Sequence, residues 1–252
     1  MTFEAHGVTH VGRVRTANQD RILVLPEIGC FAVWDGMGGQ RCGDVAAEIG
    51  VTVFRHYIES SRHPSEVTWP FGYNISLSLD ANRLLTSIRL ANRQVASRAD
   101  QDLKCAGMGT TVAAVLCRDN RIALANVGDS RVYRFRGGEL QQLSVDDTMA
   151  GLMVSKGVID PQNVSDHPMR GILTQAVGSH GELDIHLREE DVEPHDRVML
   201  CSDGLYGAVN ASAISECLSS TAPVSKRVAE LIERALDANV SDNVSVILIE
   251  YK

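Results

Sequence analysis

The stretch TTVAAVLCRDNRIALANVGDSRVYRFRGGELQQL, residues 110–143, alternates short apolar runs with turn sequences. The apolar runs cover residues 110–117, 121–127 and 131–135. The segments CRDNR, VGDSR and FRGGEL place Asp, Asn and Gly where hairpin loops of about two to four residues require them. This pattern predicts an antiparallel meander over residues 110–143.

The rest of the chain also arranges its predicted elements in blocks. Further strand-like runs cover residues 21–25, 30–34, 197–201 and 244–249. Helical periodicity is clearest over residues 84–95 and 224–235, and a third helix is predicted from about residue 44 to 58. Because strands and helices do not alternate strictly, the sequence favours an α+β fold, with helices covering antiparallel sheets, over a doubly wound fold. No repeat or linker divides the chain, so we expect one domain over residues 1–252.

Composition excludes several classes of protein. The chain has 252 residues, of which 44% are hydrophobic, and a formal charge of -8 without any concentrated basic stretch. This balance makes nucleic acid an unlikely partner. No window approaches the roughly 18 apolar residues of a membrane span, and the N-terminus lacks a signal-peptide segment, so we expect a cytoplasmic protein. The six cysteines form no CxxC pair, which favours reduced thiols over a disulfide framework or zinc site.

Four aspartates recur at the ends of apolar runs. FAVWDG (31–36), LANVGDS (124–130) and VMLCSDG (198–204) each end a run with an aspartate, and ANVSDN (238–243) places another just before a run. A single such Asp-Gly is typical of a hairpin turn or helix cap. Several alike indicate carboxylates that a rigid sheet holds around one point. Ligands that are all oxygens suit Mg²⁺ or Mn²⁺ rather than zinc.

A second signal lies in GRVRTANQDR, residues 12–21. Arg13 and Arg15 are two apart, hence on one face of an extended segment, and Asp20 follows just before an apolar run. A planar guanidinium can hold a phosphoryl group through paired hydrogen bonds. The alternative for either arginine is a solvated strand residue.

Together these motifs resemble the PPM family of metal-dependent protein serine/threonine phosphatases, the type-2C phosphatases, in its bacterial form. The resemblance runs nearly end to end, in RTANQD (15–20), DGMGG (35–39), GMGTTVAAVL (107–116), NVGDSRVYR (126–134), HPMRGILTQAVG (167–178), CSDGL (201–205) and SDNVSV (241–246). It implies a four-layer α-β-β-α sandwich of two antiparallel sheets flanked by helix pairs. The metal site would lie at one end, beside a flap near residues 146–178.

The resemblance also implies an activity. Phosphoserine and phosphothreonine in proteins would be hydrolysed by a water that bridges two Mn²⁺ or Mg²⁺ ions, in opposition to a serine/threonine kinase. Asp35 would bridge both ions, the carbonyl of Gly36 would help to hold one, and Asp203 and Asp242 would hold the other. The strand delivers Asp35, and Gly38 and Gly39 let the chain turn into the next helix.

Further roles follow from the same resemblance. Arg15 would bind the substrate phosphate, and Asp20 would orient metal-bound water. A weak third ion would use Asp129, with Gly171 as the matching position for a flap carbonyl.

Three positions depart from the family's pattern. Gln19 stands where many relatives have Glu, and it contributes no charge. Met37 stands where animal relatives carry a histidine thought to protonate the leaving group, so that role passes to metal-bound water or stays unfilled. Gly207 stands where many members have a further Asp, which would weaken a third metal site.

Two other functions fit the same fold. A pseudophosphatase would recognise phosphoproteins without turnover, but it would have no reason to retain Asp20, Asp35, Asp203 and Asp242 together. A phosphatase of small phosphoesters remains a third reading, although the sequence shows no dedicated pocket for one.

Overall fold

Two antiparallel sheets form the centre of the protein in a computed structural model, which describes residues 1–38, 42–62, 67–164 and 167–252. The first sheet has the order β1 (Phe3–His10), β11 (Val244–Tyr251), β10 (Arg197–Cys201), β7 (Arg131–Arg136) and β8 (Glu139–Gln142). The second has the order β2 (Asp20–Leu25), β3 (Cys30–Met37), β5 (Val112–Arg118), β6 (Arg121–Val127) and β9 (His186–Asp191), and the short β4 (Gly109–Thr110) also pairs with β3.

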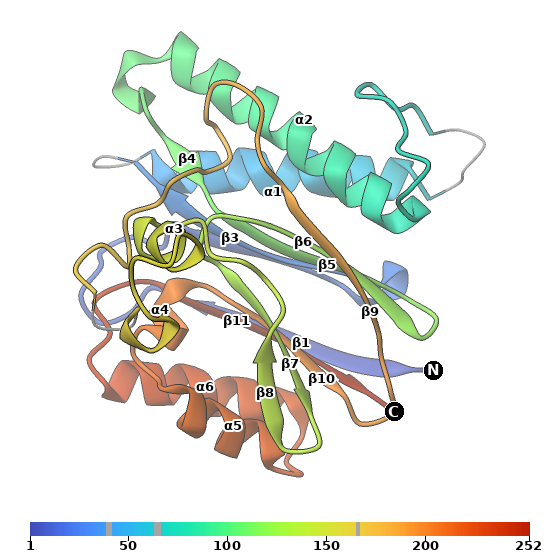
Figure 1. The fold of residues 1–252 in the computed structure, drawn as a ribbon, viewed down its shortest axis with the longest axis vertical. Coiled ribbons are helices and arrows are strands. Elements are labelled where there is room, and N and C mark those ends of the chain that lie inside the picture. Colours follow the sequence, from blue (N-terminus) through green and yellow to red (C-terminus); the bar gives the residue numbers. More distant parts are fainter. Residues whose placement is uncertain (39–41, 63–66, 165–166) are drawn as a thin grey trace.

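A pair of helices covers the outer face of each sheet (Figure 1). Helices α1 (Gly43–Ser60) and α2 (Leu79–Gln101) pack on the second sheet, and α5 (Ala211–Ser219) and α6 (Val224–Asp237) pack on the first. The predicted α+β sandwich of four layers is confirmed, as are helices close to the three predicted ranges. Helix α5 was not predicted.

Burial on both faces of the central strands explains why they were easy to find. In β3, Phe31 and Val33 face the other sheet, whereas Trp34 packs towards α1 and contacts Phe54 edge to face. Strands buried on both faces read as continuous apolar runs. The outer strands β1 and β9 are partly exposed and carry polar or charged residues, as sheet edges commonly do, and they were not predicted.

The predicted meander over residues 110–143 is only partly right. Strands β5 and β6 form a hairpin, and β7 pairs with β8 across Gly137 and Gly138, both with positive φ. The segment VGDSR is not a hairpin loop, however, because it carries the chain from β6 in one sheet to β7 in the other. This crossover places Asp129 between the two sheets instead of at an outer turn.

The prediction of six reduced thiols is wrong for two of them. Cys42, the N-cap of α1, forms a disulfide with Cys105, which lies in the 3₁₀ turn η3 (Leu103–Cys105) after α2. Their sequence separation of 63 hides the pairing, and the packing of α1 against α2 brings them together. Cys30, Cys117, Cys201 and Cys217 are unpaired.

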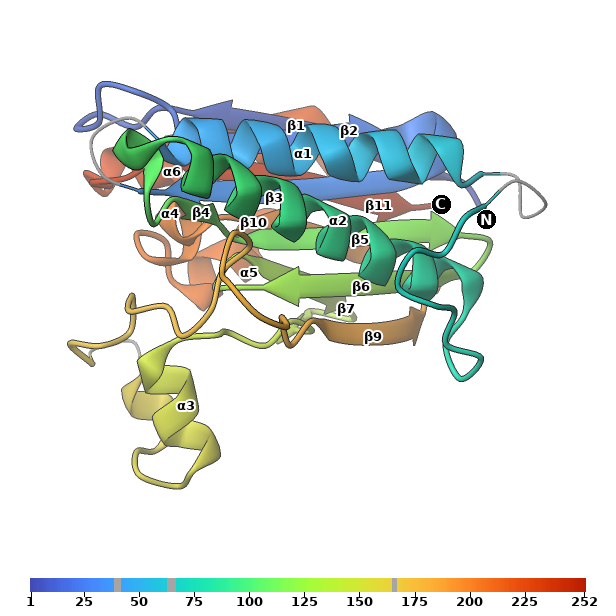
Figure 2. The same ribbon diagram turned by 90° about the horizontal axis from the view of Figure 1, so that it is seen from above.

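The predicted flap contains a short helix that projects from the body of the sandwich (Figure 2). Helix α3 (Met149–Ser155) begins at Thr148, whose side chain accepts a hydrogen bond from the amide of Gly151, and η4 (Pro161–Asn163) follows it. Within the described ranges, no helix is long and apolar enough to cross a membrane.

Candidate metal and phosphate site

The ends of both sheets bring the predicted aspartates together at the end of the sandwich where α3, β4 and α4 (Asp203–Tyr206) lie (Figure 1). Asp20 and Asp35 face each other in the β2–β3 ladder. Asp203 begins α4 directly after β10, and Asp242 lies two residues before β11. Asp129 comes from the crossover after β6. The two sheets therefore contribute acidic side chains to one location.

Burial together with repulsion between neighbouring carboxylates raises pKa values at this site. Desolvation raises the pKa of Asp35 well above its usual value, and the charges of Asp20 and Asp203 raise it further. Desolvation and the charge of Asp242 also raise the pKa of Asp203, although a side-chain hydrogen bond with Asp35 opposes the shift. Carboxylates that raise one another's pKa are stabilised as anions by a bound cation.

Two buried carboxylate oxygen atoms have no hydrogen-bond partner among the described residues, namely Oδ1 of Asp20 and Oδ1 of Asp203. Buried polar atoms are nearly always paired, so such an orphan indicates a missing ion or water. No three Asp, Glu, His or Cys side chains in the described ranges form a complete metal cage by themselves. Backbone carbonyls and water would have to complete the shell, which suits Mg²⁺ and Mn²⁺.

Asp20 is held by two serines that the sequence analysis did not single out. Its Oδ2 accepts hydrogen bonds from Ser202 Oγ at 2.8 Å and from Ser245 Oγ at 2.7 Å. Desolvation raises the pKa of Asp20 to about 6, and these two hydrogen bonds oppose the rise. In the sequence, Ser202 and Ser245 are only small polar residues beside or within an apolar run, and nothing else there indicates their contact with Asp20.

Gly36 lies where no larger residue fits. A Cβ there would come within 2.0 Å of the carbonyl oxygen of Gly43 and 2.8 Å of that of Gln19. The preceding carbonyl, of Asp35, accepts hydrogen bonds from Thr111 N at 2.8 Å and Thr110 Oγ1 at 2.9 Å. These contacts fix the backbone that carries Asp35. Gly38 has a φ of +149°, whereas Gly39 lies outside the described residues.

Arg15 points towards the predicted metal ligands. Its guanidinium donates to Asp242 Oδ2 at 2.7 Å, and this hydrogen bond is the main reason why the pKa of Arg15 is raised. Arg13 lies farther out, on Asp237 at 3.0 Å. The structure thus brings Arg15 to the site and leaves Arg13 at its edge.

Asn243 fixes the segment that carries Arg15, a role that the sequence analysis missed. Its Nδ2 donates to the carbonyls of Val11 at 2.8 Å and Ala17 at 3.0 Å, and its Oδ1 accepts from the amide of Gln19 at 2.8 Å. One buried side chain therefore joins both ends of the 11–19 segment to the start of β11.

A cavity of about 840 Å³ lies beside the carboxylates, between the flap and α4. Asp129, Asp203, Gly171 and Gly207 all line it, so the residues predicted for a third ion share one space. Desolvation raises the pKa of Asp129 to about 7, and the charge of Asp203 adds to the shift. The backbone of Asp129 is held in place by Tyr206, whose hydroxyl donates to the Asp129 carbonyl at 2.9 Å.

Comparison with known proteins agrees with this arrangement. The family model for protein phosphatase 2C matches residues 7–248. The serine/threonine protein phosphatase PstP of Mycobacterium tuberculosis is 33% identical over 239 residues, which are 95% of this chain and 43% of PstP. The chain thus spans less than half the length of that curated relative. The serine/threonine phosphatase stp of Listeria monocytogenes is 29% identical over 249 residues, or 96% of this chain and 93% of stp.

Solved structures give the same result. A crystal structure of Mycobacterium tuberculosis PstP/Ppp has a TM-score of 0.85 at 30% identity, with 100% of both chains covered. The PstP catalytic domain in complex with 2 manganese ions has a TM-score of 0.82 at 30% identity, covering 98% of this chain and 97% of that one. The chain belongs to the protein phosphatase 2C family.

Proposed function

We propose that this protein is a metal-dependent protein serine/threonine phosphatase that opposes a serine/threonine kinase. The observation that carries the proposal is the convergence of Asp20, Asp35, Asp203 and Asp242 at one end of the sandwich, with raised pKa values for the first three. The PstP catalytic domain, which has the same fold, was solved with 2 manganese ions. Relatives named serine/threonine phosphatases support phosphoproteins as the substrate class.

In this proposal, Asp35, the Gly36 carbonyl, Asp203 and Asp242 hold two Mn²⁺ or Mg²⁺ ions. When bound, such ions would supply a nucleophilic water and would neutralise charge on the phosphoryl oxygens. The chain's own part is to hold the carboxylates in fixed positions. Thr110 and Thr111 fix the backbone of Asp35 by hydrogen bonds to its carbonyl, and the close approach of Gly43 fixes the neighbouring carbonyl, that of Gly36.

Two further residues act on the substrate side. Arg15 is positioned to bind the phosphate of the substrate, because its segment is fixed by Asn243 and its guanidinium already lies at the carboxylate cluster. Asp20 is positioned to orient the nucleophilic water, since Ser202 and Ser245 hold one carboxylate oxygen and leave Oδ1 without a protein partner in the described part of the chain. Met37 offers no proton to the leaving group.

A weak third ion would bind in the cavity beside the flap. Asp129 is one of the carboxylates that line it, and Gly171 would add a carbonyl. Because Gly207 offers no side-chain ligand, we expect occupancy only at high metal concentration.

The deciding experiment measures phosphate release from phosphothreonine, phosphoserine and phosphotyrosine peptides and from a small aryl phosphate. Each substrate is tested with Mn²⁺, with Mg²⁺ and with excess chelator. We expect metal-dependent turnover of the phosphothreonine and phosphoserine peptides. Binding of phosphopeptides without turnover would support a pseudophosphatase, turnover of the aryl phosphate alone would support a small-molecule enzyme, and full activity in chelator would exclude the metal site.

A further inference from the structure

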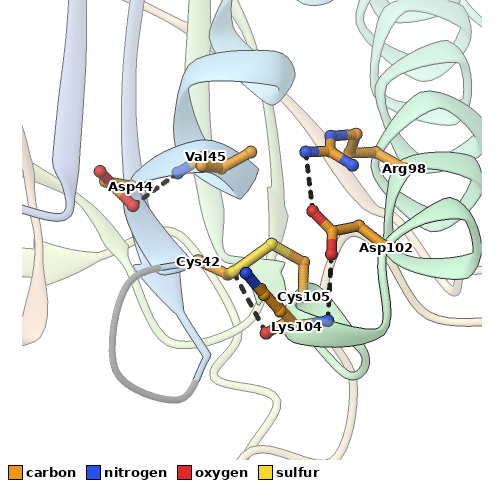
Figure 3. The surroundings of a disulfide bond; sticks show 7 residues. All are labelled: Cys42, Asp44, Val45, Arg98, Asp102, Lys104 and Cys105. Atoms are coloured by element: carbon orange, nitrogen blue, oxygen red, sulfur yellow. Dashed lines mark hydrogen bonds and ion pairs between the residues drawn. A yellow bond between two sulfur atoms is a disulfide. The ribbon is translucent and has the colours of Figure 1, made fainter.

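The Cys42–Cys105 disulfide joins the start of α1 to the turn η3 that follows α2 (Figure 3). Cys42 is the N-cap of α1, and Cys105 ends η3; their Cα atoms are 5.4 Å apart. Both residues are buried, but the adjoining turn is open to solvent, since Leu103 is 92% exposed. A small thiol reagent would therefore approach the disulfide from the side of this turn.

The two half-cystines begin the two walls of a slot that holds residues 36–38. On one side, Gly43 follows Cys42 directly, and a Cβ on Gly43 would come within 2.6 Å of the Gly36 carbonyl oxygen. On the other side, the carbonyl of Cys105 accepts a hydrogen bond from Met108 N at 3.0 Å, and the chain then enters β4.

Strand β4 completes the second wall. Thr110 and Gly109 pair with Gly36 and Met37 in the β3–β4 ladder. Gly38 is confined by both walls, because a Cβ there would lie 3.2 Å from Met108 Cα and 3.5 Å from Gly43 N. The disulfide thus ties together the two segments that set the position of the Gly36 carbonyl.

We infer that Cys42–Cys105 is a redox modification site that controls how tightly the neighbouring centre holds divalent metal. The inference rests on the proposed function in one respect, the role of the Gly36 carbonyl as a metal ligand. A dithiol reduces the Cys42–Cys105 bond by thiol–disulfide exchange. It passes two electrons and two protons to the cystine, which becomes two cysteine thiols, and the dithiol itself becomes a disulfide. A disulfide such as oxidised glutathione reverses the reaction.

The remaining cysteines should not compete for this chemistry. Burial raises the pKa of Cys117 and Cys201 to about 12 and that of Cys217 to about 11, and it also raises the pKa of Cys30. Thiols that stay protonated exchange slowly, because the thiolate is the nucleophile. Redox changes under native conditions would therefore report on one pair.

The test begins by establishing the cross-link. Native protein is equilibrated with oxidised glutathione or with dithiothreitol, alkylated and mapped as peptides. A cross-link between the Cys42 and Cys105 peptides that the dithiol removes is expected, and its absence under oxidising conditions would overturn the inference.

Calorimetric titration of Mn²⁺ then compares the oxidised protein, the reduced protein after removal of reductant, and the Cys42→Ser/Cys105→Ser variant. Loss of groups that orient a metal ligand typically weakens binding about 10- to 100-fold, and we expect that loss at one of the two tight sites in the reduced and variant proteins. Cys217→Ala, a change in a buried cysteine of the opposite helical layer, should keep the affinity of the oxidised protein.

Hydrogen exchange of metal-free protein supplies a readout that needs no ion. The Gly36 amide, which donates to the Gln19 carbonyl at 3.2 Å, should exchange faster once the disulfide is open. Equal Mn²⁺ affinity in both redox states would overturn the redox control and leave the metal centre standing. If neither the oxidised nor the reduced protein bound Mn²⁺ tightly, the metal centre would be overturned, and the redox control with it.

Discussion

The two ends of the sandwich treat buried aspartate in opposite ways. At the end where α2 begins, the Asp80 carboxylate accepts hydrogen bonds from Arg83 at 2.9 Å and from Arg118 Nη2 at 2.8 Å. Burial alone would raise the pKa of Asp80, but these arginines outweigh it and lower the pKa. At the metal-site end, the pKa values of Asp20, Asp35 and Asp129 are raised. Among the described arginines, Arg15 alone donates a hydrogen bond to a carboxylate of the proposed centre, which consists of Asp20, Asp35, Asp203 and Asp242.

The difference separates a structural carboxylate from carboxylates that are proposed to bind metal. The protein itself supplies the positive charge for Asp80, so this aspartate stabilises the fold without an external partner. At the opposite end the carboxylates outnumber their positively charged partners, which lowers the stability of the metal-free protein. Perturbed pKa values that the fold does not compensate therefore mark the functional end.

The largest expected effect is that of Asp35→Asn. We expect hydrolysis of phosphothreonine peptides to fall by on the order of 1000-fold or more, because the substitution removes the charge proposed to bridge the two ions. The same change relieves repulsion, so the unfolding temperature of the metal-free protein should be unchanged or higher. Activity assays and calorimetry in chelator measure the two effects, and a destabilised but active variant would contradict the comparison.

Arg15→Ala tests the arginine that donates a hydrogen bond to Asp242. We expect kcat/KM to fall by roughly 10- to 1000-fold, because one charge-assisted, paired contact with phosphate is lost. Mn²⁺ affinity should change little, since a guanidinium cannot ligate a cation. Arg13→Ala is the matched control: its salt bridge to Asp237 is exposed and contributes little. Unchanged kinetics for Arg15→Ala would show that the phosphate binds elsewhere.

Asp80→Asn should produce the reverse of Asp35→Asn. The free energy of unfolding should fall by about 2 to 3 kcal/mol, because Arg83, with only 4% of its side chain exposed, loses its charged partner. Catalysis and metal binding should remain, as the change lies at the other end of the sandwich. Denaturant unfolding and steady-state kinetics distinguish these outcomes, and a loss of activity in a stable variant would mean that the two ends are coupled.

The central fold could be read from the sequence because its strands are buried on both faces and its helices have a clear apolar face. Two of the edge strands, β1 and β9, could not, because they carry the polar residues that protect an edge. Asp35, Asp203 and Asp242 could be singled out because several aspartates recur at the boundaries of apolar runs, and the structure brings them to one end of the sandwich. Ser202, Ser245 and Asn243 were missed, since their roles depend on partners some 180 to 230 residues away in sequence.

The dependence of stability on pH should also distinguish the two ends. Desolvation raises the pKa of Asp20 to about 6 and that of Asp129 to about 7, from 3.8. Between about pH 4 and 7 the folded, metal-free protein therefore binds more protons than the unfolded chain, and its free energy of unfolding falls as pH rises. Asp80 has the opposite sign: its lowered pKa contributes stability above about pH 4 that is lost at lower pH.

We accordingly expect the unfolding temperature in chelator to be on the order of a few degrees higher at pH 5 than at pH 8. Saturating Mn²⁺ should remove most of this slope, because a bound cation stabilises the carboxylates as anions. Asp80→Asn should keep the slope between pH 5 and 8 and reduce the loss below pH 4. A metal-free protein that becomes more stable from pH 5 to 8 would contradict the assigned repulsion.

The smallest expected effect concerns the cavity beside the flap, where Gly207→Asp would add one carboxylate opposite Asp129. The backbone of Gly207 is right-handed helical, with φ −73° and ψ −24°, a conformation open to any residue, but the new Cβ would lie 2.8 Å from the Asp203 carbonyl oxygen, so the backbone there would have to shift. A second acidic ligand should tighten the weak third site by roughly 10-fold and leave the two tight sites unchanged. Calorimetric titration at millimolar Mn²⁺ measures the difference. Gly207→Asn, with the same shape but no charge, is the control and should raise the Mn²⁺ affinity of the third site by less.

Asp129→Ala should lower turnover while retaining the tight sites. In combination with Gly207→Asp it should cancel the increase in affinity at the third site. If Asp129→Ala instead abolished tight Mn²⁺ binding, Asp129 would belong to the core centre. That centre would then contain five carboxylates instead of four.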